Sequence, residues 1–175
     1  MTTATSIALW PTAAVVLTAA FIDIRTHTIP NRLVVPFFLA GLAVSGIMRG
    51  WAGIGQSFLG TLTAATALGL FCYMGGMGLG DLKLFAAIGA WIGPSQVFMA
   101  LLLTGMAGAV FALCWAIIGG FLGKTLLGVG SLATGFITKG FKPHETLVLT
   151  NPLARRMPYA PAIAVGTLLS FLGMR

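Results

Sequence analysis

The feature that most constrains this chain is a stretch of 40 residues, 84–123, that contains no charged side chain. At about 1.5 Å of rise per helical residue, it is about 60 Å long, enough for two crossings of a hydrocarbon core of about 30 Å. Only 7% of the 175 residues are charged and 58% are hydrophobic, whereas about a quarter of the residues in a soluble domain are charged. We therefore expect an all-α integral membrane protein, because unpaired backbone groups are too costly in lipid.

Uncharged runs of suitable length predict about six transmembrane helices in a single membrane-embedded domain, residues 1–175. The expected helices cover residues 5–22, 33–48, part of 53–74, 82–92, 97 to about 122, and 159–173. The sequence Gly93-Pro94-Ser95-Gln96 separates the fourth helix from the fifth, because proline disfavours helix in the residue before it.

Lys and Arg are distributed unevenly over the loops between these helices. The loops after the first, third and fifth helices hold eight of the ten: Arg25, Arg32, Lys83, Lys124, Lys139, Lys142, Arg155 and Arg156. The opposite face has only Arg49 and Arg175. The positive-inside rule therefore places these three loops in the cytoplasm and both termini outside it. The net charge of +7 is mostly a topology signal, with some attraction to anionic lipid; it does not indicate a nucleic-acid partner.

The chain has three acidic residues, and two of them are expected at the same membrane depth. Asp23 ends the first helix and Asp81 begins the fourth, so both fall on the cytoplasmic side, while Glu145 lies in the last long loop. Two neighbouring carboxylates cannot both ionise easily and hold one proton between them. The ionised partner can take a proton from water while the protonated one donates to the scissile amide. This pair suits hydrolysis of a peptide bond.

Other interpretations of the same residues are open at this point. Asp81 alone suits the N-cap of a helix, and Asp23 alone suits a solvated charge at a helix end. An Asp pair can relay protons in a small proton-coupled transporter, and the chain can also be a non-catalytic assembly protein. Lys83 either helps to keep a carboxylate ionised and holds an acidic group of the substrate, or anchors the topology.

The segments around both aspartates carry a family resemblance. Asp23 precedes a turn at Pro30-Asn31, and Asp81 lies in Gly78-Leu79-Gly80-Asp81-Leu82-Lys83, a GxGD motif with a trailing lysine. With the segment of residues 158–166, these motifs resemble the prepilin peptidase family of membrane aspartic proteases, in the short form associated with tight-adherence (Flp-type) pili. The resemblance spans essentially the whole chain.

The resemblance implies removal of short basic leader peptides from prepilins and pseudopilins at the cytoplasmic face of the bacterial or archaeal inner membrane. Asp23 and Asp81 would be the catalytic pair. Gly78 and Gly80 would let the substrate backbone approach, and Lys83, Pro30 and Asn31 would support the site. The implied partners are a prepilin substrate helix, membrane lipid, and pilus or secretion assembly proteins.

Longer relatives carry a cysteine-bearing cytoplasmic domain between the first two helices and also methylate the new N-terminus. Here that loop is short and has no cysteine, so we expect peptidase activity without methyltransferase activity. Neither a metal nor another cofactor is expected, since Cys72 and Cys114 are too few for a four-cysteine zinc site. Gly123-Lys124-Thr125 lacks the first glycine of a phosphate loop, where Ile118 stands, so no nucleotide is expected.

Overall fold

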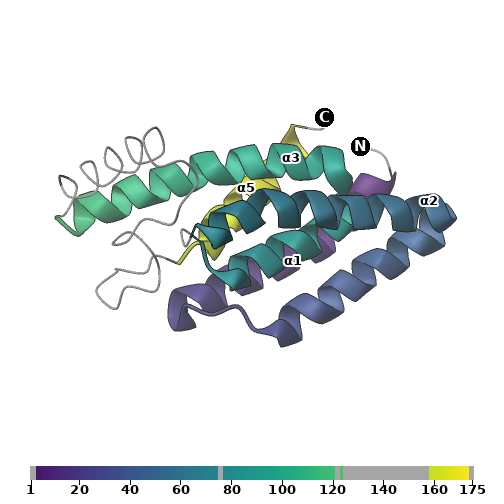
Figure 1. Cartoon of the computed structure of the whole chain (residues 1–175), viewed down its shortest axis with the longest axis horizontal. Helices are drawn as coiled ribbons and strands as arrows, with labels where there is room; N and C mark the ends of the chain where they lie inside the picture. The colour runs from purple at the N-terminus through teal and green to yellow at the C-terminus, as the bar shows by residue number, and fades with distance from the viewer. Residues whose placement is uncertain (1–2, 75–76, 121–122, 124–157, 174–175) are drawn as a thin grey trace.

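The computed structural model of the chain describes residues 3–74, 77–120, 123 and 158–173. Its helices are α1 (Thr3–Thr26), α2 (Asn31–Tyr73), α3 (Leu79–Ile118) and α5 (Ala160–Leu172), shown in Figure 1. The described residues contain no β-strand, in agreement with the expected all-α fold. α1, α2 and α3 are each long and apolar enough to cross a membrane, and α5 is a shorter apolar helix.

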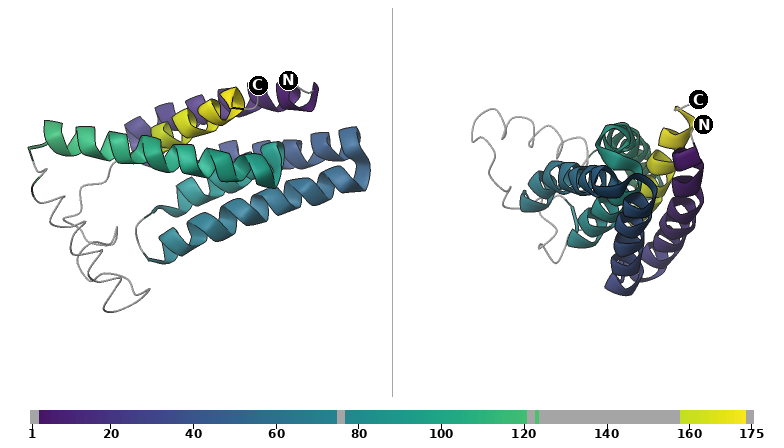
Figure 2. Two further views of the ribbon diagram at one scale, coloured as in Figure 1. Left: turned by 90° about the horizontal axis from the view of Figure 1, so that it is seen from above. Right: turned by 90° about the vertical axis from the view of Figure 1, so that its right-hand side faces the viewer.

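Two of these helices, α2 and α3, bend at a glycine with a positive φ. Gly50 in α2 has φ 61° and Gly93 in α3 has φ 74°, values that glycine adopts readily because it has no Cβ. Figure 2 shows α2 folding back on itself, so that it consists of two segments of about 30 Å each. Both bends fall between helices that the sequence predicted, although the number of membrane crossings and the sides of the termini stay predictions.

The bend at Gly93 leaves one backbone acceptor without its usual partner, and the fold supplies another. Pro94 has no N–H to donate to the Ala90 carbonyl four residues earlier. The Ser57 hydroxyl, from the second half of α2, donates to that buried carbonyl at 2.6 Å. Close to this bond, Gly60 and Gly89 pack backbone to backbone, so a Cβ on either would overlap the other. Small residues thus let α2 and α3 approach closely.

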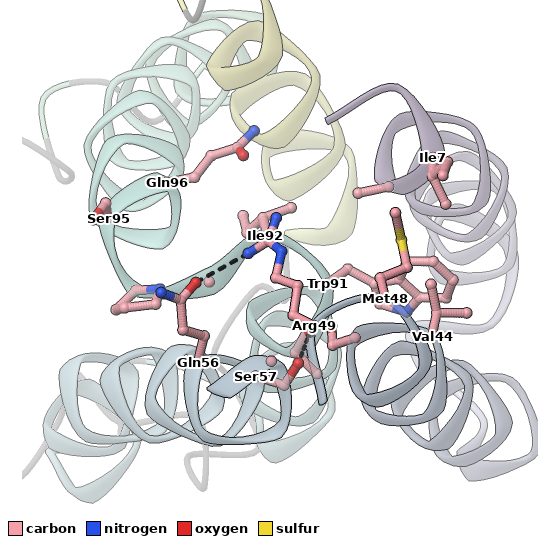
Figure 3. A pocket seen from close by; sticks show the side chains of 16 residues that line it. Ile7, Val44, Met48, Arg49, Gln56, Ser57, Trp91, Ile92, Ser95 and Gln96 are labelled. Carbon is pink, nitrogen blue, oxygen red and sulfur yellow. Dashed lines mark hydrogen bonds between the residues drawn. The ribbon is translucent and has the colours of Figure 1, made fainter. Parts of the chain in front are cut away.

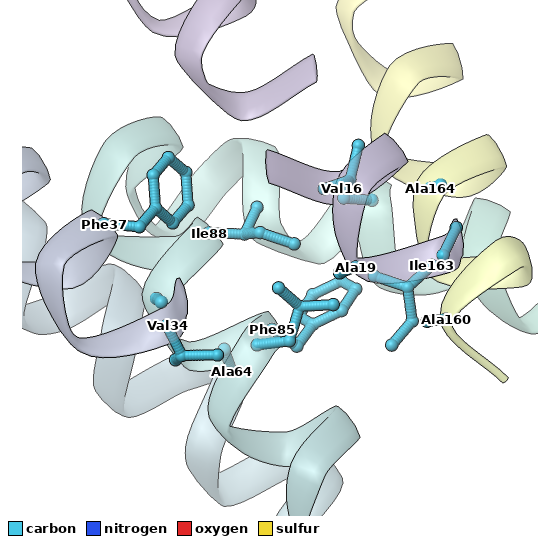
Figure 4. Packing of buried hydrophobic residues seen from close by; sticks show 14 of the residues in the cluster. Val16, Ala19, Val34, Phe37, Ala64, Phe85, Ile88, Ala160, Ile163 and Ala164 are labelled. Carbon is cyan, nitrogen blue, oxygen red and sulfur yellow. The ribbon is translucent and has the colours of Figure 1, made fainter. Parts of the chain in front are cut away.

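A single cluster of buried apolar side chains joins all four helices (Figure 4). It includes Val16 and Ala19 from α1, Val34, Phe37 and Ala64 from α2, Phe85 and Ile88 from α3, and Ala160, Ile163 and Ala164 from α5. Figure 2 shows α5 lying beside α1, and α5 contacts both α1 and α3. This packing brings the end of α1, the start of α3 and the start of α5 together at one end of the bundle.

Large apolar side chains also cover much of the outside of the described helices. Leu17, Phe58 and Leu102 are each more than 50% exposed. An apolar exterior of this extent is unusual for a soluble monomer and suits helices that are solvated by lipid. The described helices are therefore those of a membrane protein.

Candidate active site

Asp23 lies in the last turn of α1 and is 94% buried, with a relative exposure of 6%. Its Oδ2 accepts a hydrogen bond of 3.1 Å from the backbone N–H of Ala160, the first residue of α5. The first N–H groups of a helix have no partner inside that helix and form its positive end. The carboxylate is therefore not a solvated helix-end charge, as one interpretation of the sequence had it, but is held inside the bundle by α5.

Asp81 lies in the first turn of α3 and is half-buried. The backbone N–H of Gly78 donates a hydrogen bond to its carboxylate. Gly78 is the N-cap of this helix, so the interpretation of Asp81 as the N-cap is wrong. Asp81 instead occupies the third helical position, from which an acidic side chain can reach back to the N-cap N–H.

The two carboxylates come together at this end of the bundle. Asp81 at the start of α3 lies close enough to Asp23 at the end of α1 for the two charges to interact. Cys72, near the end of α2, and Tyr159, just before α5, also lie within reach of the Asp81 charge. The site thus holds two acids from different helices, of which Asp23 is buried and Asp81 is half-buried.

The turn between α1 and α2 packs against the GxGD segment. A Cβ built on Gly80 would lie 3.5 Å from the Ile29 Cβ, which is ordinary van der Waals contact. Lys83 Nζ donates to Asn31 Oδ1 at 3.4 Å. Pro30, with φ −71° and ψ 135°, is the N-cap of α2 and sets the direction in which Asn31 begins that helix. The two motifs, far apart in sequence, therefore form one surface.

A small apolar groove of about 190 Å³ lies between the start of α2 and the start of α3, and its lining includes Leu82 and Lys83, the two residues that follow Asp81. Its lining residues are Asn31, Val34, Val35, Phe38, Leu82, Lys83, Ala86 and Ala87. Asn31 and Lys83, which are exposed, are the polar members of this lining, while the others are apolar. The groove is therefore suited to an apolar side chain or helix face.

Every site residue expected from the sequence lies at this end of the bundle: Asp23, Pro30, Asn31, Gly78, Gly80, Asp81 and Lys83. Sequence reasoning missed the Ala160 N–H, because a backbone donor carries no residue-type signal. It also gave no role to Tyr159, although the segment that contains Tyr159 was noted as part of the resemblance. The loop of residues 124–157, with five of the expected cytoplasmic cations and Glu145, lies outside the described residues.

Comparison with known proteins agrees with the family resemblance that the two motifs indicate. The model of the type IV leader peptidase family matches residues 10–113, more than half of the chain. Similar curated proteins include prepilin leader peptidase/N-methyltransferases from three bacteria. The Bacillus subtilis relative is 30% identical over 169 residues, which cover 91% of this chain and 52% of the relative. The Escherichia coli relative is 33% identical over 111 residues, 56% of this chain and 46% of the relative.

The Aeromonas salmonicida relative is 31% identical over 106 residues, 57% of this chain and 36% of the relative. The chain thus spans between about a third and a half of the length of these three relatives. No solved structure matches it. The matched region of the family contains both aspartates, the Pro-Asn turn and the GxGD segment. By this match, the chain belongs to the type IV leader peptidase family.

Proposed function

We propose that this protein is an aspartic endopeptidase that removes the short basic leader from type IV prepilin-like precursors at the cytoplasmic face of the inner membrane. The observation that carries the proposal is the convergence of Asp23 and Asp81 from different helices. The family assignment supports prepilin processing, and the paired carboxylates supply a way to hydrolyse the leader peptide bond.

The proposed chemistry needs one proton shared by the pair. The ionised carboxylate takes a proton from a water molecule, whose oxygen attacks the scissile carbonyl. The protonated carboxyl donates its proton to the carbonyl oxygen, which gives a gem-diol intermediate. As the C–N bond breaks, the carboxyl that took the water proton gives it to the departing nitrogen, and the other carboxylate takes a proton back from the gem-diol, so that the pair again holds one proton. Both acids are needed in different protonation states, and the titration belongs to the pair rather than to one residue.

The apolar groove between the starts of α2 and α3 supports a membrane-held substrate. A prepilin whose hydrophobic helix packs against Val35, Phe38 and Ala86 would present its leader at the depth of the carboxylates. Holding the substrate in this way replaces diffusion with orientation. Lys83, at the edge of the groove and hydrogen-bonded to Asn31, is placed to meet a polar or acidic group of the same substrate.

The finer topology is part of the proposal. The bends at Gly50 and Gly93 allow α2 and α3 to cross the membrane twice each, which with α1 and α5 gives six crossings. The predominance of Lys and Arg in the loops after the first, third and fifth expected helices supports a site on the cytoplasmic side and both termini outside. Only residues 27–30 separate α1 from α2, which supports a peptidase without an inserted methyltransferase domain at this position.

A proton-coupled transporter is the main competing function. It would need polar groups near the membrane midplane, commonly at broken helices. In the described part of the chain, both acids lie together at one end, and the breaks at Gly50 and Gly93 lie near the other. The arrangement therefore favours hydrolysis at a surface over proton transfer across the membrane.

The test is co-expression of the chain with a candidate prepilin in a membrane, comparing wild type with Asp23→Asn and Asp81→Asn. The measurement is the mass of the substrate, and blotting of the membrane fraction checks that each variant is inserted. We expect the wild type to remove one leader-sized mass and both variants to leave the precursor intact. Cleavage that survives in an inserted variant would contradict the paired mechanism. An uncleaved precursor with wild type, for every prepilin tried, would favour an assembly role.

A further inference from the structure

A second cavity, of about 260 Å³, lies at the other end of the bundle from the aspartates (Figure 3). It forms where α1 begins, α2 bends at Gly50 and α3 bends at Gly93. The polar residues Arg49, Gln56, Ser95 and Gln96 belong to its lining. None of them belongs to the candidate active site.

Arg49 is the cation of this cavity. Figure 3 shows its side chain reaching inward from α2 to the space between the helices, with a hydrogen bond from Nη1 to Gln56 Oε1 of 3.0 Å. A guanidinium has five N–H donors, and this bond uses one of them. In the part of the chain that the structure describes, the acids are Asp23 and Asp81, and both lie at the far end of the same helices. Among the described residues, the Arg49 charge is thus paired with the Gln56 amide.

Further polar residues line the same cavity. Gln96 is 95% buried, and its Nε2 makes only a long contact of 3.5 Å with Ser170 Oγ. The second segment of α3 begins at Pro94, so the positive end of that segment borders the cavity beside Ser95. The Arg49 guanidinium is the charged donor of this lining, and hydrogen bonds from a charged donor are the strong ones by which proteins bind phosphate oxygens.

The surroundings indicate that the cavity lies at the depth of lipid headgroups. Trp10 and Trp51, on α1 and α2 at this end, are 76% and 88% exposed. Exposed tryptophans at helix ends mark the interface between membrane and water. Ile47 is also highly exposed and provides apolar surface for an acyl chain. The cavity is smaller than the roughly 300–1,000 Å³ of sites that enclose a drug-sized ligand, which suits a headgroup whose chains remain outside.

We propose that this cavity binds the phosphate of a membrane phospholipid through Arg49, with the glycerol backbone and acyl chains on the apolar exterior next to it. Bound there, the headgroup links the bend of α2 to the bend of α3 at the point where both helices reverse. The proposal does not rest on peptidase activity, since no residue of the aspartate end takes part.

The test uses the purified full chain in a neutral detergent and native mass spectrometry. Three probes separate the sources of binding: phosphatidylglycerol has both phosphate and acyl chains, diacylglycerol has the chains alone, and inorganic phosphate has no chains. We expect phosphatidylglycerol to bind in preference to both others. Arg49→Gln should weaken its binding at least ~10-fold, because a charge-assisted hydrogen bond is lost. Arg25→Gln, the same charge change at the aspartate end, is the matched control.

Several results would overturn the proposal. Equal binding of phosphatidylglycerol and diacylglycerol would show that the phosphate is not recognised. Binding of inorganic phosphate as tight as that of phosphatidylglycerol would identify a site for a free anion. Equal loss in Arg49→Gln and Arg25→Gln would indicate general charge attraction. If Arg49→Gln does not fold, Gln56→Leu keeps the cation but removes the amide that orients it. Gln56→Leu should weaken the binding of phosphatidylglycerol severalfold. If this variant bound phosphatidylglycerol as tightly as the wild type, that result would also contradict the proposal.

Discussion

The two ends of the bundle hold charges of opposite sign in different ways. At one end, Asp23 accepts from the start of α5 and Asp81 from the start of α3, so backbone N–H groups at helix starts hold both acids. At the other end, Arg49 is held by a single side-chain amide, that of Gln56, next to a cavity. The acids are partly withdrawn from solvent, whereas the Arg49 side chain is exposed.

This difference indicates which end is built for chemistry and which for structure. A carboxylate pair must be held in a fixed geometry to share a proton, and donors from the backbone move little. A cation beside an open cavity is free to meet a ligand that arrives from the membrane. We therefore expect substitutions at the aspartate end to change catalysis, and substitutions at the bend end to change stability and lipid binding.

The largest expected effect comes from removing both acids. Asp23→Asn and Asp81→Asn should each reduce the rate of prepilin cleavage by ~10³-fold or more, and the double variant should lose no more than either single one. Groups that act as a unit give such non-additive losses. The measurement is the initial rate of cleavage in membranes with equal amounts of each variant. Additive losses would show that the two carboxylates act independently and would break the proposed pair.

Much of the aspartate end of the bundle could be predicted from the sequence. In a chain with three acids, a carboxylate next to an apolar run is conspicuous, and Asp23 and Asp81 each lie at such a boundary. The two helix breaks could also be predicted. The charged residue Arg49 interrupts the apolar run at Gly50, and the Gly93-Pro94 pair interrupts the run in α3. These signals are local, and each can be recognised within about ten residues.

The rest depends on packing between distant segments. The bond from the Ala160 N–H to Asp23 joins residues 137 positions apart, and nothing in an Ala-Pro sequence marks a backbone donor. The cavity around Arg49 is likewise formed by α1, α2 and α3 together, and each of its residues alone suits an ordinary helix end. The N-cap interpretation of Asp81, an alternative to the catalytic one, fails because α3 begins at Leu79, and helix starts in a sequence are uncertain by a residue or two.

Gly80→Ala tests whether the aspartate end leaves room for a substrate backbone. The structure accommodates a Cβ there, since the nearest Ile29 atom would be 3.5 Å away, and alanine favours helix over glycine. We expect an unchanged or slightly higher midpoint of thermal unfolding, but cleavage ~10–100-fold slower because the substrate is displaced. Gly55→Ala, with no atom within 4 Å of the added Cβ, is the control. Full activity in Gly80→Ala would show that no substrate approaches there.

Filling the apolar groove should have a smaller effect and a different kinetic signature. Ala86→Leu places added methyl groups in the groove between α2 and α3, where the substrate helix is proposed to pack. We expect KM for the prepilin to rise at least ~10-fold with little change in kcat, because the added isopropyl group occupies space that the substrate needs, and a single methylene in an apolar pocket already changes discrimination ~10-fold or more. Ala43→Leu, on an exposed part of α2, should leave both parameters unchanged. If Ala86→Leu lowered kcat and left KM unchanged, the substrate helix would not bind in this groove.

The smallest expected effect on cleavage is at the bend end, where Ser57→Ala should change stability alone. The variant removes the donor to the buried Ala90 carbonyl, and Pro94 cannot replace it. An unsatisfied buried acceptor costs ~1–3 kcal/mol, so the midpoint of thermal unfolding in lipid-free detergent should fall measurably. Ser95→Ala, an exposed serine beside the same bend, should change it little. Cleavage per folded molecule should stay at the wild-type rate in both variants. If Ser57→Ala instead slowed cleavage without lowering stability, the two ends would be coupled, and the division between a catalytic end and a structural end would be wrong.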